Sequence, residues 1–421
     1  WTAAERGEVL QEWARLILDY QSDLARLITL EQGKPLAEAT GEVTYAAQFL
    51  EWFAEEGKRS YGDVIPAPKR GQHIVVIRQP IGVTAAITPW NFPAAMITRK
   101  AGAALAAGCT MIVKPSEATP LTALALARLA EAAGLPPGVF NVLTGLNAES
   151  IGRALTESAV VRALSFTGST EVGRKLMAQC ATHLTKVSLE LGGNAPFIVF
   201  DDADIDAAVE GAMASKFRNT GQTCVCVNRF LVQDKVHDVF VAKLSKLMSK
   251  LRVGDGLEAD IDQTALINHA ALEKVEAHVS DAIEGGATVE LGGKPHSLGG
   301  TYYQPTLLTG VRSGMRCVRE ETFGPVAAVM RFKNEEDAVE LANDTEYGLA
   351  AYFYCHDMNR VWRVAEQLEA GIVGVNEGII STPVAPFGGI KASGIGREGS
   401  RYGLDEYMEL KYLCMGSTRD S

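Results

Sequence analysis

The sequence of 421 residues lacks the features of several broad protein classes. It contains no apolar run that would span a bilayer, because the longest candidate, residues 101–113, includes glycines and Cys109 and is shorter than the ~20 residues that a span needs. No signal-peptide pattern stands at its start. We therefore expect a protein of the cytoplasm, or of the mitochondrial matrix in a eukaryote, with no membrane partner.

Cysteine is sparse and not organised into a framework. The seven cysteines are odd in number and irregularly spaced, which argues against structural disulfides and favours a reducing compartment. No Cys-x-x-Cys pair occurs, and the seven histidines are scattered. We therefore expect no metal site.

Positive charge is also scarce, since 40 Lys and Arg residues face 51 Asp and Glu residues and the net charge is −11. This balance argues against nucleic acid as a partner, because phosphate binding needs a basic face. It also constrains an anionic substrate, since a local arginine then has to overcome a repulsive overall field. The hydrophobic content of 47% is otherwise typical of a globular chain, and the length predicts two or three domains.

What the sequence does have is a regular alternation of strands and helices. The pattern is typical of parallel sheets with helices on their faces, so we predict two α/β domains in series. The last strand-like segment, Tyr407–Met415, has no local partner, and such strands often pair with another subunit. The expected strands include 83–88, 110–114, 139–143, 161–166, 197–200, 230–232, 325–332 and 371–376, and the expected helices include 96–107, 148–157, 170–179, 205–217 and 236–250.

The stretch FRNTGQTCVC, residues 217–226, holds two cysteines one residue apart. Their spacing disfavours a zinc site and would strain a disulfide between Cys224 and Cys226. Two interpretations of Cys224 stay open: an inert buried thiol, or a nucleophile in a loop that presents backbone N–H groups beside the sulfur. Such donors would stabilise an oxyanion formed at that sulfur.

Two further polar side chains lie in apolar surroundings. Glu190, in LELGGN, is either an edge-strand carboxylate facing water or a general base whose pKa rises in an apolar pocket. Asn91, in TPWNFP, follows an expected strand. Its amide is either a turn group or a donor to a developing oxyanion. The sequence alone leaves both pairs of alternatives open.

Two other strand ends carry residues suited to a dinucleotide. In KPSE, Lys114 and Glu117 could reach a ribose, because open α/β sheets bind ligands at the carboxyl ends of their strands. In FTGST, Gly168 and Ser169 stand at an expected helix N-terminus, which is a site for pyrophosphate. The standard GxGxxG fingerprint is absent here, so each of these signals is weak alone.

Seven motifs in order resemble those of the aldehyde dehydrogenase superfamily: PWNFP, KPSE, FTGSTEVG, LELGGN, GQTC, EETFGP and PFGGIKASGIGREG. The resemblance implies an α/β fold with a Rossmann-like cofactor domain, an α/β catalytic domain and a small β oligomerisation element. It implies a homodimer or homotetramer, and an N-terminal segment that we expect to be missing here. The implied domains cover residues 1–60 with 79–192, residues 193–400, and residues 61–78 with 401–421.

The resemblance also implies a role for each motif. Cys224 is the expected nucleophile, Glu190 the general base, and Asn91 with the backbone N–H of Cys224 the oxyanion hole. Glu117 favours NAD, because a carboxylate accepts from the ribose 2′-hydroxyl and repels a 2′-phosphate, while Lys114 would still tolerate NADP. The residues expected at the cofactor are Thr88, Trp90, Lys114, Ser116, Glu117, Gly168, Ser169, Leu191, Glu321 and Phe323.

Within the superfamily, KFRNTGQTCVCVNR and GIISTPVAPFGGIKASGIGREGS resemble the group that oxidises succinate semialdehyde. The implied substrate is a small anionic aldehyde whose carboxylate is held by Arg218, Arg99 and Ser381. Glutarate semialdehyde or another short aldehyde, and a non-catalytic relative with the same fold, stay open as alternatives. Cys226 is a redox candidate, because a reversible bond to Cys224 would block catalysis.

Overall fold

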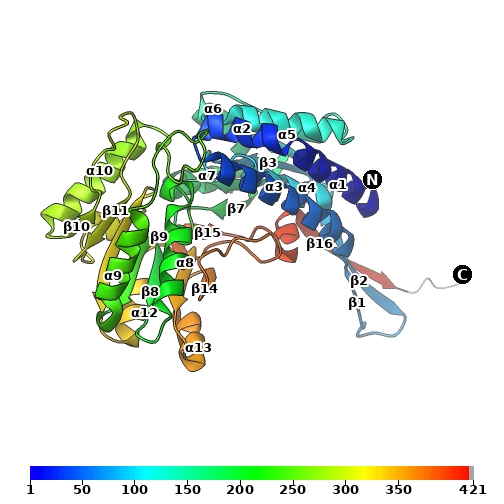
Figure 1. The fold of residues 1–421 in the computed structure, drawn as a ribbon. Helices are drawn as coiled ribbons and strands as arrows, with labels where there is room; N and C mark the ends of the chain where they lie inside the picture. The colour runs from blue at the N-terminus through cyan, green and yellow to red at the C-terminus, as the bar shows by residue number, and fades with distance from the viewer. Residues whose placement is uncertain (417–421) are drawn as a thin grey trace, which may run out of the picture.

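The computed structural model describes residues 1–416, and its strands form three sheets (Figure 1). The first has six strands in the order β15-β7-β6-β3-β4-β5. Neighbouring strands are parallel except for β15, which runs antiparallel to β7. Its members are β3 (Val83–Ile87), β4 (Thr110–Lys114), β5 (Phe140–Val142), β6 (Val161–Thr167), β7 (Lys186–Glu190) and β15 (Gly394–Ile395).

The second sheet has seven strands in the order β10-β11-β12-β9-β8-β13-β14. It is parallel except for the β10–β11 pair at one edge. Its members are β8 (Ala195–Val199), β9 (Val227–Gln233), β10 (Thr288–Leu291), β11 (Thr306–Thr309), β12 (Val326–Phe332), β13 (Ala350–Tyr354) and β14 (Ile372–Val375).

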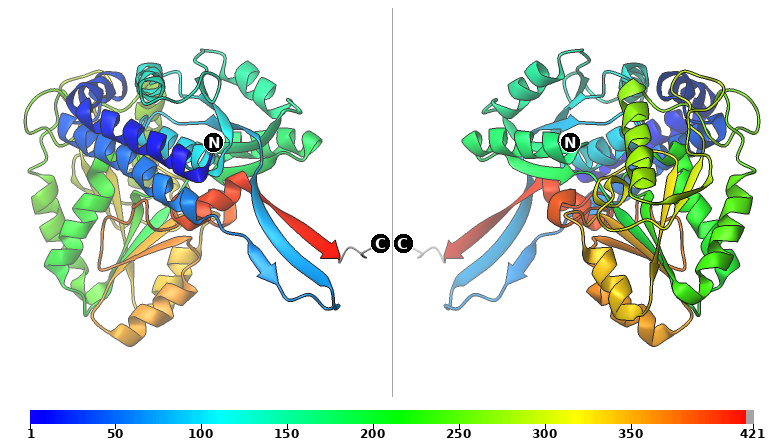
Figure 2. Two further views of the ribbon diagram at one scale, coloured as in Figure 1. Left: turned by 90° about the vertical axis from the view of Figure 1, so that its right-hand side faces the viewer. Right: turned by 90° about the vertical axis from the view of Figure 1, so that its left-hand side faces the viewer.

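The third sheet is antiparallel and projects from the body of the molecule (Figure 2). It consists of β1 (Asp63–Ile65), β2 (Gln72–Pro80) and β16 (Met408–Gly416). The terminal strand β16 has its partner far away in the sequence, because it pairs with β2 along its whole length. Residues 417–421 of the expected oligomerisation element lie outside the described residues.

Helices connect the strands and cover the two parallel sheets (Figures 1 and 2). Local chemistry sets several of their ends: Thr2 and Glu5 form a capping box at the start of α1, and Gly108 ends α4 in the left-handed conformation. The helices are α1 (Ala3–Asp19), α2 (Gln21–Gln32), α3 (Leu36–Glu56), α4 (Ala95–Ala107), α5 (Pro120–Ala132), α6 (Ala148–Thr156), α7 (Thr170–Cys180), α8 (Ile205–Phe217), α9 (Asp234–Met248), α10 (His269–Glu284), α11 (Arg316–Arg319), α12 (Glu335–Asn343) and α13 (Met358–Gln367).

The predicted α/β alternation is confirmed, and α8 and β4 have the predicted bounds. The division into residue ranges stays a prediction. β15 falls within the range 193–400 but joins the six-stranded sheet, beside β7. No helix within residues 1–416 combines the length and apolar composition needed to cross a membrane.

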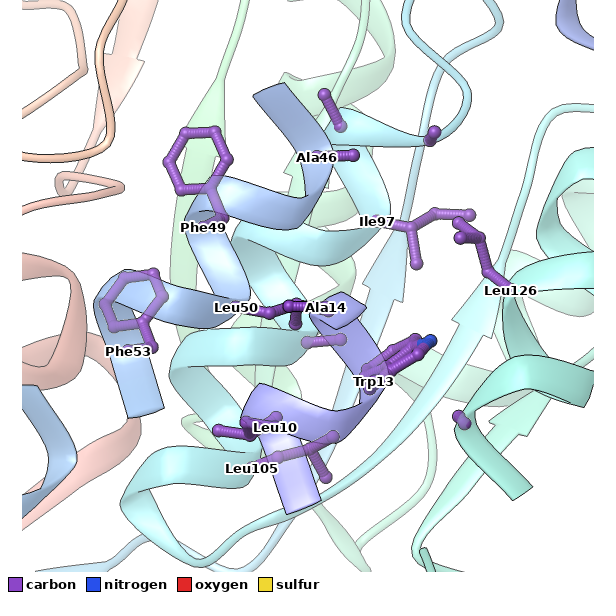
Figure 3. Packing of buried hydrophobic residues seen from close by; sticks show 14 of the residues in the cluster. Leu10, Trp13, Ala14, Ala46, Phe49, Leu50, Phe53, Ile97, Leu105 and Leu126 are labelled. Atoms are coloured by element: carbon purple, nitrogen blue, oxygen red, sulfur yellow. The ribbon is translucent and has the colours of Figure 1, made fainter. Parts of the chain in front are cut away.

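Helix α4 is the central element of the core beside the six-stranded sheet. All of its residues are buried, and it packs against α1 and α3 through side chains such as Trp13, Phe49 and Leu50 (Figure 3). Alanine and glycine make this contact close, since a Cβ on Gly102 would lie 3.2 Å from the Phe53 ring. Large side chains buried in this way contribute about 1.5–3 kcal/mol each. The helix therefore fixes the TPWNFP segment that precedes it.

Candidate active site

A cleft of about 360 Å³ is lined by segments that adjoin both large sheets. The six-stranded sheet contributes the ends of β3, β6 and β7. The opposite wall comes from the loop that holds Cys224, the start of α10, and the EETFGP loop. Of the residues singled out from the sequence, the cleft brings together Trp90, Asn91, Gly168, Ser169, Leu191, Cys224, Glu321 and Phe323.

The loop before Cys224 has an unusual backbone. Asn219, Thr220 and Gly221 all have positive φ, at 51°, 56° and 74°. Such a run is costly for residues with a Cβ, and it persists only where surrounding contacts fix it. The Asn219 N–H donates to Glu38 Oε2 at 2.7 Å, and a Cβ on Gly221 would lie 2.2 Å from the carbonyl oxygen of Gly324. Close packing against the EETFGP loop therefore requires glycine at 221.

Cys224 is partly exposed in the cleft. Burial raises the pKa of its thiol to about 12, and the carboxylates of Glu321 and Glu190 add to the shift. The resting group is therefore a thiol at neutral pH, and its attack on a carbonyl requires transfer of the proton to a base. Within residues 1–416, the backbone N–H of Cys224 donates to no protein atom, so it is free to bind an oxyanion.

Glu190 ends β7 and is buried, with both carboxyl oxygens lacking a hydrogen-bond partner among the described residues. This placement rules out the interpretation of an edge-strand carboxylate facing water. Burial raises its pKa well above the ordinary value, and the nearby charge of Glu398 adds to the shift. A Cβ on Gly388 would lie 2.8 Å from Glu190 Oε1, so glycine at 388 leaves room for this carboxyl.

Asn91 follows β3 and is buried. Its Nδ2 donates to the carbonyl of Gln222 at 3.1 Å, two residues before Cys224. An amide nitrogen carries two hydrogens, so one remains for a second acceptor. Its backbone carbonyl accepts from Lys34 Nζ at 2.7 Å and from Asn219 Nδ2 at 3.1 Å. The side chain and the main chain of Asn91 are thus both held beside the loop that precedes Cys224.

The other end of the cleft meets the N-terminus of α7. Ser169 caps this helix by accepting from Val172 N–H, and the nearby Thr167 Oγ1 is buried without a partner among the described residues. Across the cleft, Glu321 Oε1 accepts from Gly193 N–H at 2.9 Å, and Phe323 contacts Trp90 edge to face with 5.7 Å between ring centroids. A helix N-terminus, a free hydroxyl and a fixed carboxylate form a donor and acceptor set suited to a pyrophosphate and a ribose.

Four expected cofactor residues, Thr88, Lys114, Ser116 and Glu117, do not line this cleft. The backbone N–H of Thr88 donates to the carbonyl of Lys114 at 3.1 Å, which joins the ends of β3 and β4. Lys114 is buried, and its Nζ donates to the exposed Glu117 at 2.9 Å. The carboxylate of Glu117 is therefore partly neutralised by its neighbour.

Only two of the three residues expected at the substrate line the same cavity. Arg218 and Ser381 line one small cavity together with Val225, which follows Cys224. Arg99 does not line it. The Arg99 guanidinium is buried 3.2 Å from Glu398 and lies over the rings of Phe49 and Phe387. Its expected contact with a substrate stays a prediction, whereas Arg218 and Ser381 share one cavity wall.

The aldehyde dehydrogenase family model matches residues 1–413. The chain belongs to the aldehyde dehydrogenase family. It is 63% identical to Escherichia coli succinate-semialdehyde dehydrogenase [NADP(+)] and 62% identical to Pseudomonas aeruginosa glutarate-semialdehyde dehydrogenase, in both cases over 99% of this chain and 86% of the relative. The crystal structure of an E. coli NADP-dependent enzyme superposes with a TM-score of 0.98 at 63% identity, over 99% of this chain and 86% of that one.

In this aldehyde dehydrogenase, all seven cysteines are free thiols. Cys226 is buried, its Sγ lies 3.8 Å from the carbonyl oxygen of Arg218, and its backbone N–H closes a turn on the carbonyl of Thr223 at 3.0 Å. Burial raises the pKa of this thiol. Its role as a redox partner of Cys224 stays a prediction.

The sequence analysis missed several residues of this dehydrogenase's site. Lys34 and Glu42, from the N-terminal helical region, reach the Asn91 segment, and Lys274 of α10 lines the cleft. The available signal was weak: Lys34 lies in an ordinary helix-breaking Gly-Lys-Pro, and Glu42 lies on a helix rich in charge. Only the folded chain brings Lys34 to a residue 57 positions away.

Proposed function

We propose that this aldehyde dehydrogenase oxidises succinate semialdehyde to succinate with a nicotinamide dinucleotide as oxidant, through a covalent intermediate on Cys224. The observation that carries the proposal is the arrangement around this thiol. It shares a cleft with Asn91, and the next residue lines the cavity that holds Arg218 and Ser381. Both curated relatives described above are named for semialdehydes with a distal carboxylate.

Cys224 passes its proton to Glu190, which releases it to solvent, and Sγ forms a bond to the aldehyde carbon. The electron pair of the carbonyl double bond moves to the oxygen, which becomes an oxyanion. The Asn91 amide and the backbone N–H of Cys224 donate to this oxygen. Loss of a hydride from the same carbon leaves a thioester. Glu190 then takes a proton from water, whose oxygen attacks the thioester carbon. The bond from this carbon to Sγ breaks, the carboxylic acid is released, and Glu190 returns the proton to the Cys224 sulfur.

The cleft fits a nicotinamide dinucleotide, which supplies the hydride acceptor when bound. Gly168 and Ser169 at the start of α7 would hold the pyrophosphate, and Glu321 would hold the ribose nearest the reacting carbon. Lys114 and Glu117 would reach the other ribose. Because Lys114 partly neutralises Glu117, the repulsion of a 2′-phosphate is reduced. We therefore propose that both NAD and NADP are accepted.

Arg218 would bind the distal carboxylate of the substrate, with Ser381 as a second donor. A guanidinium suits a carboxylate because it offers two parallel N–H groups, and it supplies the local positive charge that a chain of net charge −11 needs. Glutarate semialdehyde, one methylene longer, is the second candidate, because the Pseudomonas aeruginosa relative is named for it.

The projecting sheet is proposed as the oligomerisation element of a homodimer or homotetramer. Strand β16 forms one edge of this sheet, and it exposes large apolar side chains, including Leu410 and Tyr412, as does Val64 of β1. Edges and apolar faces of this kind are usually covered in the assembled protein. Light scattering of the whole protein would measure the subunit number.

The test of the proposed activity is formation of reduced nicotinamide, followed by its absorbance, with succinate semialdehyde, glutarate semialdehyde or butanal and with NAD or NADP. We expect the highest kcat/KM for succinate semialdehyde and formation of succinate. A Cys224→Ser variant is expected to lose turnover with every aldehyde. Equal activity on butanal would overturn the substrate assignment, and undiminished turnover by Cys224→Ser would overturn the mechanism.

A further inference from the structure

An ion pair between Lys34 and Glu42 lies in the protein interior beside the oxyanion segment, with no exposed side-chain surface on either partner. We propose that this pair positions the Asn91 amide and so sets the geometry of the oxyanion hole. The inference rests on the proposed function, which assigns Asn91 one half of that hole. Lys34 and Glu42 are thus positioning residues that act through Asn91.

Three contacts satisfy the Lys34 ammonium. Its Nζ lies 2.6 Å from Glu42 Oε2, donates to the backbone carbonyl of Asn91 at 2.7 Å, and lies 3.8 Å from the centroid of the Phe92 ring. Burial lowers the pKa of Lys34, and the charge of Glu42 opposes that shift. Two of the three contacts are thus made to consecutive residues of the PWNFP motif.

The second oxygen of Glu42 binds the other end of the same segment. Oε1 accepts from the backbone N–H of Ala94 at 2.8 Å and of Ala95 at 3.3 Å, where α4 begins. The first N–H groups of a helix have no partner within the helix, so a carboxylate there is stabilising. One ion pair therefore binds the segment between β3 and α4 at two points, the carbonyl of Asn91 and the N–H of Ala94.

The direction of the free N–H of the Asn91 amide depends on the position of the main chain at residues 91–95. The other hydrogen of Nδ2 is committed to Gln222, and Oδ1 is buried without a partner among the described residues. The bond to Gln222 is the one contact that orients the side-chain amide among the described residues, so its position also depends on the main chain that Lys34 holds. A displacement of about 1 Å at such a donor can cost on the order of 10²-fold in rate.

Stability alone does not explain a charged pair at this place. Apolar residues of similar volume often stabilise a core as well as a buried ion pair does, or better. An apolar pair could not donate to the Asn91 carbonyl or accept from Ala94. The contacts that require charged or polar groups are those that reach the oxyanion segment.

The test uses the variant Lys34→Met/Glu42→Gln, which leaves no buried charge unpaired and keeps an acceptor for Ala94. We expect kcat with succinate semialdehyde to fall about tenfold or more, since misplaced oxyanion donors act on the transition state, with little change in the KM of the aldehyde or the cofactor. The matched control is Lys58→Met/Glu55→Gln, an exposed pair in the same N-terminal region, which is expected to leave kcat unchanged.

Combination with Asn91→Ala separates a positioning role from a merely structural one. Asn91→Ala alone is expected to lower kcat by about 10²–10³-fold. Adding Lys34→Met/Glu42→Gln to it should then cost no more than about twofold, because residues that act through one group are not additive. If the two losses multiply, the positioning role is overturned.

If Asn91→Ala leaves kcat unchanged, the proposed oxyanion hole fails instead, and the two failures are thereby distinguished. Should the double variant not fold, Glu42→Gln alone, which keeps Lys34 and an acceptor for Ala94, allows the same comparison. Its loss in kcat must likewise disappear in the Asn91→Ala background, or the proposal is wrong.

Discussion

Two buried carboxyl groups close to each other, Glu190 and Glu398, have opposite surroundings. Glu398 contacts the ammonium of Lys100 and lies 3.2 Å from the guanidinium of Arg99. Burial alone would raise the pKa of Glu398, but these two positive charges outweigh it and lower the pKa below its ordinary value. Glu190 has no hydrogen-bond partner among the described residues, and its pKa is raised. Burial therefore does not decide the state of a carboxyl group; its partners do.

The difference indicates why one carboxyl can act as a base and the other cannot. Glu398 is ionised and already bound, so it has little tendency to accept a proton. The pKa of Glu190 is raised well above that of an ordinary carboxyl group, and the charge of Glu398 adds to the shift, so Glu190 binds a proton more readily, as a general base must. Arg99 is paired with Glu398. It therefore differs from Arg218, which lines a cavity together with Ser381.

The largest effect expected from this contrast is on turnover. Glu190→Gln removes the base but keeps the shape, and we expect kcat to fall by about 10²–10⁴-fold. The control is Glu406→Gln, which removes a carboxyl whose pKa burial also raises but whose charge, unlike that of Glu190, is not among the main charges that shift the pKa of the Cys224 thiol. Steady-state kinetics with succinate semialdehyde would measure both. Loss of less than about threefold in Glu190→Gln would contradict the assignment of the base.

The next effect is on the free energy of unfolding, which the two Gln substitutions should change differently. Glu398→Gln leaves Lys100 and Arg99 without their buried partner, and the free energy of unfolding should fall by about 3–5 kcal/mol. Glu190→Gln removes an unpaired acid, so stability at neutral pH should rise or stay the same. Urea unfolding of both variants tests this. A large loss of stability in Glu190→Gln would show that its carboxyl has a partner.

The pH dependence of this stability follows from the same shifts. Because folding raises the pKa of Glu190 above its ordinary 4.5, its contribution is fully present below pH 4.5 and is lost as the pH rises through the folded pKa. Folding lowers the pKa of Glu398, so its contribution is present above pH 4.5 and is lost as the pH falls through the folded pKa. Unfolding curves of wild type and each Gln variant across pH would resolve the two opposite trends.

A smaller effect is expected on the pH profile of turnover. In Glu398→Gln, the negative charge that helps to raise the pKa of Glu190 is gone, so the rise of kcat with pH should move to lower pH. The profile of kcat against pH for wild type and variant, at saturating aldehyde and cofactor, measures the shift. A shift to higher pH would contradict the claim that the charge of Glu398 raises the pKa of Glu190.

The smallest effect concerns Cys226, which is buried beside the nucleophile loop and lines no part of the cleft. If it closes reversibly on Cys224, peroxide should inactivate the enzyme and dithiothreitol should restore it. A Cys226→Ala variant should be inactivated at the same rate but should not recover. Equal recovery of the variant would end the redox hypothesis.

The sequence was most informative where local pattern and chemistry coincide. Strand–helix alternation predicted the parallel sheets, and α8 had the predicted bounds because its apolar spacing and Asp204 cap are local. The motifs predicted part of the cleft lining, including Asn91, Cys224 and Glu321, but not the residues of α10. Contacts over long distances were harder to predict. The resemblance grouped residues 61–78 with 401–421, but the register of β16 against β2 and the contact of Lys34 with Asn91 depend on the packing of remote segments. For the same reason, nothing in the sequence showed that Arg99 lies beside Glu398.

The central claim is that Arg218 selects an aldehyde with a distal carboxylate for attack by Cys224. The most direct test measures kcat/KM of wild type, Arg218→Lys and Arg218→Ala with succinate semialdehyde and with butanal. For Arg218→Ala we expect a loss of about thirtyfold or more on the semialdehyde, equivalent to about 2 kcal/mol, and almost none on butanal. Arg218→Lys should fall between, because it keeps the charge without the paired N–H groups. An equal loss on both aldehydes, or none on the semialdehyde, would contradict the account.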